Sequence, residues 1–356
     1  MNRNIIIIIC LIFVINSIYS EIQNIKNQKT NIKKEKILTE EEFTTLVNKI
    51  KYLNTTERIY TIKSLEKFTE NDKKKFYDLL AEISLNDADP IIKEKALEFI
   101  AIEKADCKKC IEAYKKNLFS KEEKVQLQAL KGIENLQLKD LKKEMVEILN
   151  KTDFSQNGIF INALLRTLGN LKYNQKEITD ILLEKYKSED THQEIKRTIL
   201  LYAGASENLV FKDILKEIIE KDDEDIYLRA YAVNSIGKLA KNWKQNEKKE
   251  IINQLKKIYN DILSISNPKE RVKYNPLKQH IILSLIRLGD DSIKEELKQM
   301  ALDDDANVRL KALEYIEDLE LKEYKEMIEI KYKYDPSKSV KNKAKEILKK
   351  WGELKE

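Results

Sequence analysis

A pair of apolar residues four positions apart recurs along most of the chain and limits what it can fold into. In each pair a branched aliphatic residue precedes a small or apolar one. The second members follow one another at steps of 31 to 36 residues, with one step of 49. A spacing of four places both residues on one helix face, and a period near 33 is typical of a helical hairpin stacked on copies of itself. The pairs are Ile92/Ala96, Val125/Ala129, Ile159/Ala163, Ile195/Ile199, Leu228/Ala232, Leu277/Ile281, Val308/Ala312 and Val340/Ala344.

Polar residues repeat at fixed distances from each pair. Aspartate or serine stands nine residues before the second member in six of the eight copies and seven before it in four, and lysine or arginine stands three before it in six. Aspartate or serine directly before an apolar helical run caps the free amides of the first turn. Pro90 follows Asp89 at the first helical position, where its missing amide proton costs nothing.

This pattern resembles the HEAT repeat, especially its short bacterial form, in segments such as Asp87–Ala96, Asp303–Ala312 and Asp335–Ala344. The resemblance covers about residues 55–352 and implies a right-handed α-solenoid with a ladder of bonds between successive turns. Phe154, Phe160 and Val272 depart from the pattern in two copies. By resemblance, the structural ladder would consist of Asp87, Lys93, Asp190, Lys196, Asp223, Arg229, Asp303, Arg309, Asp335 and Lys341.

Composition favours the same fold. The chain has 7 Gly and 4 Pro, no strand-like alternation, and 36% charged against 42% hydrophobic residues. We therefore expect an all-α solenoid of about eight to nine two-helix HEAT-like repeats over residues 39–356. The step of 49 residues predicts an insertion near 241–276, which ends in a loop carrying Lys269, Arg271 and Lys273. Such a loop either contributes to function or is a tolerated surface insertion.

The first 38 residues differ from the rest. A short positive start, the apolar run Ile5–Ile15 and small residues up to Ser20 predict a secretory signal peptide over residues 1–20, cleaved near Ser20. The alternative is an uncleaved anchor, which would bring the protein to a membrane. Residues 21–38 are polar and basic and are expected to form a flexible lead. Either reading places the protein in the periplasm or cell envelope.

Cys107 and Cys110 form the sharpest local motif. They flank two lysines at the expected start of a helix, where a thiolate is favoured. The pair is a candidate disulfide, either structural or redox-active. A metal site would need two more ligands, and His192 and His280 lie several repeats away.

The sequence gives no support for an enzyme. Only two histidines occur, and no nucleophile-elbow, phosphate-loop or zinc-protease motif is present. We therefore expect no catalytic residues, cofactor or bound metal. A net charge of +5 against 66 basic and 61 acidic residues gives no basic surface for nucleic acid.

A partner-binding groove is predicted from apolar residues at positions expected to face solvent on the second helices of the central repeats. The alternative is that the helical register is off by one residue, or that these helices pack more widely. We expect a non-enzymatic exported scaffold that binds a protein or peptide through its concave face. The other hypotheses are a thiol redox-linked role of Cys107 and Cys110 and a membrane-anchored envelope assembly factor. The candidate binding residues are Leu127, Ile161, Leu165, Leu201, Tyr231 and Leu283, with Lys269, Arg271 and Lys273 of the loop.

Overall fold

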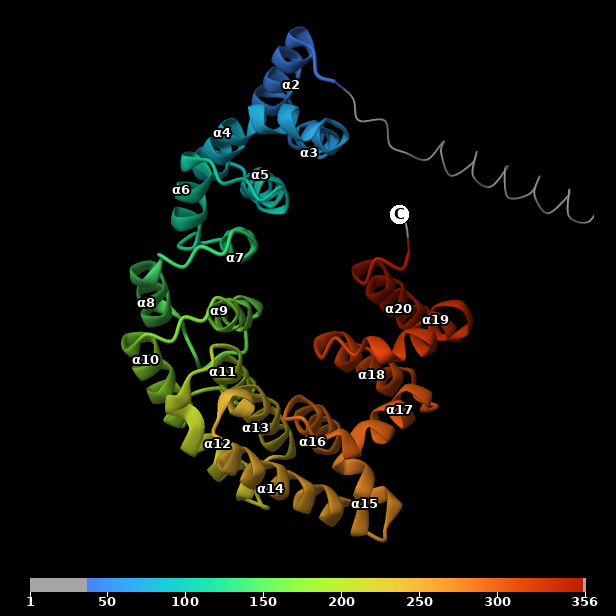
Figure 1. The fold of residues 1–356 in the computed structure, drawn as a ribbon. Helices are drawn as coiled ribbons and strands as arrows, with labels where there is room; N and C mark the ends of the chain where they lie inside the picture. Colours follow the sequence, from blue (N-terminus) through green and yellow to red (C-terminus); the bar gives the residue numbers. More distant parts are fainter. Residues whose placement is uncertain (1–36, 355–356) are drawn as a thin grey trace, which may run out of the picture. The chain divides into compact units, whose positions relative to one another are not determined.

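The computed structural model describes residues 37–354, and no β-strand occurs among them (Figure 1). The predicted signal peptide and nearly all of the predicted lead lie outside the described residues. The prediction that the lead extends to residue 38 is wrong at its last position. Leu38 is buried, and its amide donates to Asp72 Oδ2 at 3.1 Å. Thr39 caps the first described helix, α2 (Glu40–Tyr52), because its hydroxyl accepts the Glu42 amide.

The chain divides into two compact units, Met1–Leu136 and Gln137–Glu356. In unit 1 the helices form consecutive hairpins, in which α2 packs on α3, α4 on α5, and α6 on α7. The second helices α3, α5 and α7 also contact one another in order, as a solenoid requires (Figure 1). The remaining bounds are α3 (Thr55–Ser64), α4 (Glu70–Asn86), α5 (Pro90–Ile102), α6 (Lys108–Asn117) and α7 (Glu123–Asn135).

Unit 2 continues the hairpin pattern. Its first helices α8, α10, α12, α14, α17 and α19 alternate with second helices α9, α11, α13, α16, α18 and α20, and α15 is inserted before α16. Contacts join α9 to α11, α11 to α13, α13 to α16, and α18 to α20. The bounds are α8 (Lys142–Lys151), α9 (Ile159–Asn170), α10 (Lys176–Lys187), α11 (Gln193–Ala205), α12 (Lys212–Glu220), α13 (Ile226–Leu239), α14 (Gln245–Ser264), α15 (Pro268–Lys273), α16 (Asn275–Arg287), α17 (Lys294–Leu302), α18 (Ala306–Asp318), α19 (Lys325–Tyr334) and α20 (Lys338–Lys350).

The expected all-α solenoid of HEAT-like hairpins is confirmed within each unit. In most copies the apolar pair of the second helix is buried, as in Ile92/Ala96 and Val340/Ala344. None of the helices among residues 37–354 has the length and apolarity needed to cross a bilayer.

The register predicted for the third repeat is wrong by one residue. Ile159 is 66% exposed, whereas Phe160 and Leu164 are buried. The core pair of α9 is therefore Phe160/Leu164, and Ala163 lies at the edge of the core. The sequence Ile159–Leu165 is nearly all apolar, so several pairs in it satisfy the four-residue spacing.

The ladder between repeats forms at two of the expected places. Arg309 donates to both carboxylate oxygens of Asp335 in the next repeat, each at 2.9 Å, and Arg58 pairs in the same way with Asp87. Arg229 instead pairs with Asp222 of its own repeat. The other expected ladder residues make no ion pair between repeats within the described part of the chain: Lys93, Asp190, Lys196, Asp223, Asp303 and Lys341.

The recurring aspartate has a more regular local role. Asp87, Asp303 and Asp335 each accept the amide of the residue two positions later, at 2.8 to 3.0 Å. This turn brings the chain out of the first helix of the hairpin and into the cap of the second. The aspartate is therefore chiefly a turn residue, and only some copies use it to bond the neighbouring repeat.

Close backbone packing joins the second helices of unit 2. A Cβ atom on Gly204 of α11 would lie 2.6 Å from Ser235 Cα, and one on Gly237 of α13 would lie 2.6 Å from Ser284 Cβ. The two serines donate back across the same contacts, Ser235 to Leu200 O at 2.6 Å and Ser284 to Val233 O at 2.8 Å. Glycine is thus needed where the backbones approach most closely.

The insertion is more ordered than predicted. Its long helix α14 contacts α16, and the expected loop contains the short helix α15, which also contacts α16 (Figure 1). Lys269 and Lys273 are exposed, and Lys273 pairs with Glu270 at 2.8 Å, so part of the positive charge is neutralised locally.

Candidate partner-binding site

The structure contradicts the predicted apolar groove at three of its six positions. Ile161, Leu165 and Leu283 are at most 4% exposed, so they belong to the core. The one-residue shift of α9 turns Ile161 and Leu165 inward. Leu283 is covered because α16 contacts α13, α14, α15 and α17. Leu127, Leu201 and Tyr231 remain half-buried, Leu127 in unit 1 and the other two in unit 2.

A different surface gathers on the second helices of unit 2. We name it the aromatic strip and define it as Tyr227, Tyr231, His280 and Tyr315, with Arg197 and Lys311 at its ends. Tyr227 is 48% exposed, and Tyr231 and His280 are half-buried. Tyr315 is almost completely buried, so it forms the floor of the strip.

The members of the aromatic strip lie on four helices and make two groups of contacts. The Arg197 guanidinium of α11 lies 4.9 Å from the ring centre of Tyr227 on α13. Tyr231 follows one turn later on α13, and its ring lies 6.0 Å from His280 of α16. His280 lies 6.2 Å from the ring of Tyr315 on α18, which Lys311 covers at 5.6 Å.

Burial keeps the histidine of the strip neutral. His280 Nδ1 and the Tyr315 hydroxyl are 3.4 Å apart. Loss of solvent, together with the positive charges of Lys311, Arg287 and Lys238, lowers the pKa of His280 to about 4. The neutral imidazole therefore offers an aromatic face at neutral pH.

A pocket of about 670 Å³ lies at the C-terminal ends of the second helices of unit 2. Lys238 of α13 and Arg287 of α16 line it, and Arg287 pairs with Asp318 and donates to Asn234. Lys238 is half-buried and makes no ion pair among the described residues. Burial, and then the charge of Arg287, lowers the pKa of the Lys238 ammonium. This ammonium lines the pocket and could receive a carboxylate.

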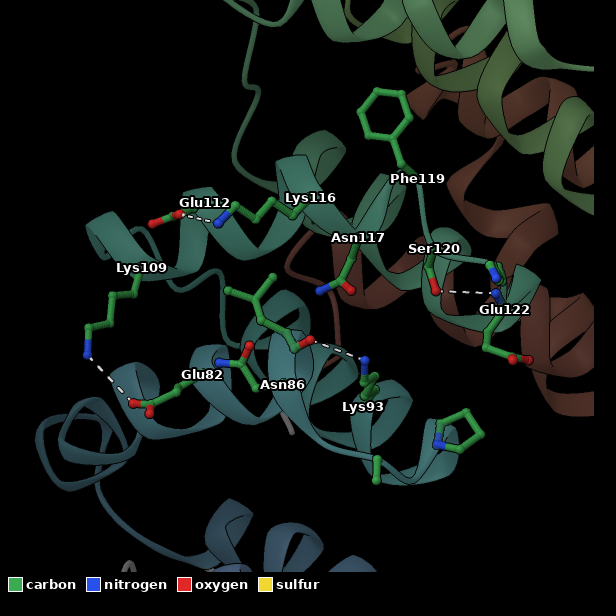
Figure 2. Close-up of a pocket in the computed structure, with 14 residues that line it drawn as sticks. Glu82, Asn86, Lys93, Lys109, Glu112, Lys116, Asn117, Phe119, Ser120 and Glu122 are labelled. Atoms are coloured by element: carbon green, nitrogen blue, oxygen red, sulfur yellow. Dashed lines mark hydrogen bonds and ion pairs between the residues drawn. The ribbon is translucent and has the colours of Figure 1, made fainter.

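A second pocket, of about 760 Å³, lies in unit 1 between α4 and α6 (Figure 2). Its polar groups mostly bond one another. Lys116 pairs with Glu112 at 2.7 Å, Lys93 donates to Leu85 O at 3.1 Å, and Asn117 donates to Ser84 Oγ at 3.3 Å. A ligand here would have to displace these bonds, so this pocket is the weaker candidate.

The cysteine motif lies at the N-terminal end of α6, where Lys109 of the motif also lines this pocket. Cys107 and Cys110 are joined by a disulfide across the first turn. Cys107 is the N-cap of α6, and its sulfur accepts the Cys110 amide at 3.0 Å. Among residues 37–354, no group of three or more His, Cys, Asp or Glu side chains is arranged to hold a metal ion.

Sequence reasoning found Tyr231 but missed Tyr227, His280 and Tyr315. One signal in the sequence points to the strip, since Tyr231, His280 and Lys311 all stand directly before the second apolar member of their repeats. That shared position is half-buried in all three repeats.

No protein-family description and no curated protein matches the chain. Among solved structures it is similar to a chain of the structure in which Kap95p binding induces the switch loops of RanGDP to adopt the GTP-bound conformation. The identity is 13% over 87% of this chain and 40% of that one, with a TM-score of 0.44. Kap121p gives 14% over 86% and 40%, with a TM-score of 0.39. An engineered protein gives 16% over 76% and 98%, with a TM-score of 0.22. The chain thus spans 40% of the length of the first two, and its HEAT-like architecture rests on its own hairpins.

Proposed function

We propose that this chain is a non-enzymatic exported scaffold that binds a protein or peptide through the aromatic strip of unit 2. The observation that carries the proposal is the row of contacts from Tyr231 through His280 and Tyr315 to Lys311, with the Arg197–Tyr227 contact one turn away on α13. Tyrosine and arginine dominate the binding energy of protein interfaces, because they bury a large rigid area and also bond polar groups.

The chemistry of the strip favours a partner segment with apolar and acidic side chains. Tyrosine rings accept apolar groups. The cations at both ends are already paired, Arg197 with Asp225 and Lys311 with Glu314, so the attraction for a further carboxylate comes chiefly from Lys238. Lys238 follows Tyr231 on α13 by seven residues, which is about two helical turns. Its side chain lines the pocket described above. A carboxylate of the partner would there find a cation that has no ion pair among the described residues.

Site-specific photo-crosslinking tests this proposal. A photoreactive residue replaces Tyr231 in one version and Tyr334 in the other, because Tyr334 is an equally aromatic but 75% exposed position of unit 2 outside the strip. We expect the same cell-envelope protein or peptide to be crosslinked from position 231 and not from 334. Crosslinking from both positions, or from 334 alone, would contradict a site at the strip.

The variant Tyr227→Ala/Tyr231→Ala measures the strength of binding to the crosslinked partner. We expect at least tenfold weaker binding with unchanged helicity, since truncating central aromatic anchors costs about 1–3 kcal/mol or more. Tyr334→Ala is the matched control and should bind as the parent does. Equal affinity of the parent, the double variant and the control for the partner would show that the two tyrosines do not contribute to binding.

Export remains part of the proposal, supported by the apolar run Ile5–Ile15 and the small residues that follow it. A retained N-terminal segment would make the same scaffold a membrane-anchored envelope assembly factor. Fractionation of the source cells, with the N-terminal mass of the recovered protein, separates the two forms. A full-length protein in the cytoplasm would rule out both.

A further inference from the structure

The two sulfurs of the Cys107–Cys110 disulfide differ sharply in access. Cys107 is partly exposed at the N-cap of α6, whereas Cys110 is 0% exposed and its sulfur lies 3.8 Å from the Tyr77 carbonyl of α4. The S–S bond therefore runs from the core to the surface. An attacking thiolate must approach in line with that bond. Only the Cys107 sulfur offers such an approach from solvent.

The groups around the two cysteines would also stabilise their reduced forms. A thiolate on Cys107 would keep the Cys110 amide as a donor and would lie at the positive end of the α6 dipole, beside the exposed lysines 108 and 109. The Cys110 thiol would keep its proton and donate to the Tyr77 carbonyl. Each sulfur thus has a distinct partner suited to one protonation state. A disulfide that acts only as a structural crosslink does not require different surroundings for its two sulfurs.

We propose that Cys107–Cys110 is a thiol–disulfide exchange site that oxidises dithiols of other proteins, with Cys107 as the attacked sulfur. This activity belongs to unit 1 and is independent of partner binding at the aromatic strip of unit 2.

The reaction balances without any further reagent for one turnover. A partner thiolate attacks Cys107 Sγ, the S–S bond breaks, and Cys110 Sγ leaves with the electron pair and takes a proton. The second thiol of the partner loses its proton and attacks the partner sulfur of the mixed disulfide, and Cys107 leaves as a thiolate. The partner gains one disulfide, and this chain is left with the Cys110 thiol and the Cys107 thiolate, so two electrons and one proton are transferred from the partner.

The first experiment locates the reactive sulfur. Full-length Cys110→Ser and Cys107→Ser variants, both with Cys10→Ser to leave a single thiol, react with glutathione disulfide under native conditions. Mass spectrometry follows the mixed disulfide. We expect Cys107 to be modified at least tenfold faster than Cys110. Equal rates, or a faster Cys110, would overturn the assignment of the attacked sulfur.

The second experiment separates exchange from a structural crosslink. The oxidised Cys10→Ser protein is mixed with an excess of a synthetic peptide that carries two reduced cysteines. We expect peptide disulfide to form in step with the loss of the protein disulfide, while the helical circular dichroism stays constant. A disulfide that resists the peptide until denaturant unfolds the protein is a structural crosslink, and the proposal is then wrong. Tyr334→Ala in the same background, at an exposed position outside the aromatic strip, should exchange at the parent rate.

Discussion

His280 illustrates how one side chain acquires its character from elements that are distant in sequence. The ring lies between Tyr231 of α13 and Tyr315 of α18, and three cations from α13, α16 and α18 surround it. Each repeat position alone is ordinary. When the repeats stack, the two tyrosine rings exclude water from His280, and the nearby cations disfavour a positive charge on its imidazole. Only a structure that aligns successive repeats reveals this, because both tyrosines are 35 or more positions from His280 in the sequence.

The lowered pKa of His280 predicts a defined pH dependence. The folded state holds this histidine at a pKa of about 4, below the ordinary value of 6.5, so the unfolded state binds more protons between these values. The stabilisation is full above pH 6.5 and is lost as the pH falls toward 4. Thermal unfolding of the parent and of His280→Gln should therefore converge over this range, with the parent losing more stability. A constant difference between the two proteins from pH 7.5 to 4 would contradict a buried neutral imidazole.

Within the helical elements, glycine sets the distance between successive second helices. Alanine in place of a helical glycine ordinarily stabilises a helix by about 0.5–1 kcal/mol. At Gly237 the added methyl would meet Ser284 of α16, and its nearest carbon is only 2.6 Å away. Overpacking of this kind costs about 1–3 kcal/mol. We therefore expect Gly237→Ala to lower the free energy of unfolding, against the helix propensity, as measured by urea denaturation.

A double-mutant cycle with Ser284→Gly checks that the cause is this contact. Removing the serine side chain opens the space, although it also removes the hydrogen bond to Val233. The double variant should be more stable than the sum of the two single effects predicts. If the two changes in the free energy of unfolding were strictly additive, the effect of Gly237→Ala would not arise from its contact with Ser284.

The helices also show which features of the fold could be predicted from the sequence. The hairpin period and the capped second helices were predictable, because turn residues and apolar pairs act locally. The register of α9 was not, since its apolar residues satisfy two alternative pairings, Ile159/Ala163 and Phe160/Leu164. Packing against α11 decides between them. The prediction of the binding groove failed because packing between repeats was not considered. A second helix in the middle of the stack packs against its hairpin partner and against the second helices of both neighbouring repeats, so more of its surface is buried than the sequence pattern suggested.

In the molecule as a whole, the division into two compact units means that contacts are made chiefly within each unit. A repeat array is stabilised by the repeats themselves and by their nearest-neighbour interfaces. A local defect should therefore be felt near its origin and fade along the array. The sequence period alone could not locate the division, since the steps between repeats do not change at residue 136.

The buried Arg309–Asp335 pair offers a test of this locality. Asp335 is completely buried as a side chain and also accepts the Ser337 amide. Asp335→Ala would leave Arg309 uncompensated, at a cost of about 3–5 kcal/mol. We expect amide hydrogen exchange to accelerate in α17 to α20 and to remain unchanged in α2 to α5. Asp190→Ala is the control, since its side chain is exposed and makes no ion pair among the described residues, so its effect should stay within about 0.5 kcal/mol. Acceleration of equal size in α2 to α5 would mean that the two units unfold as one cooperative body.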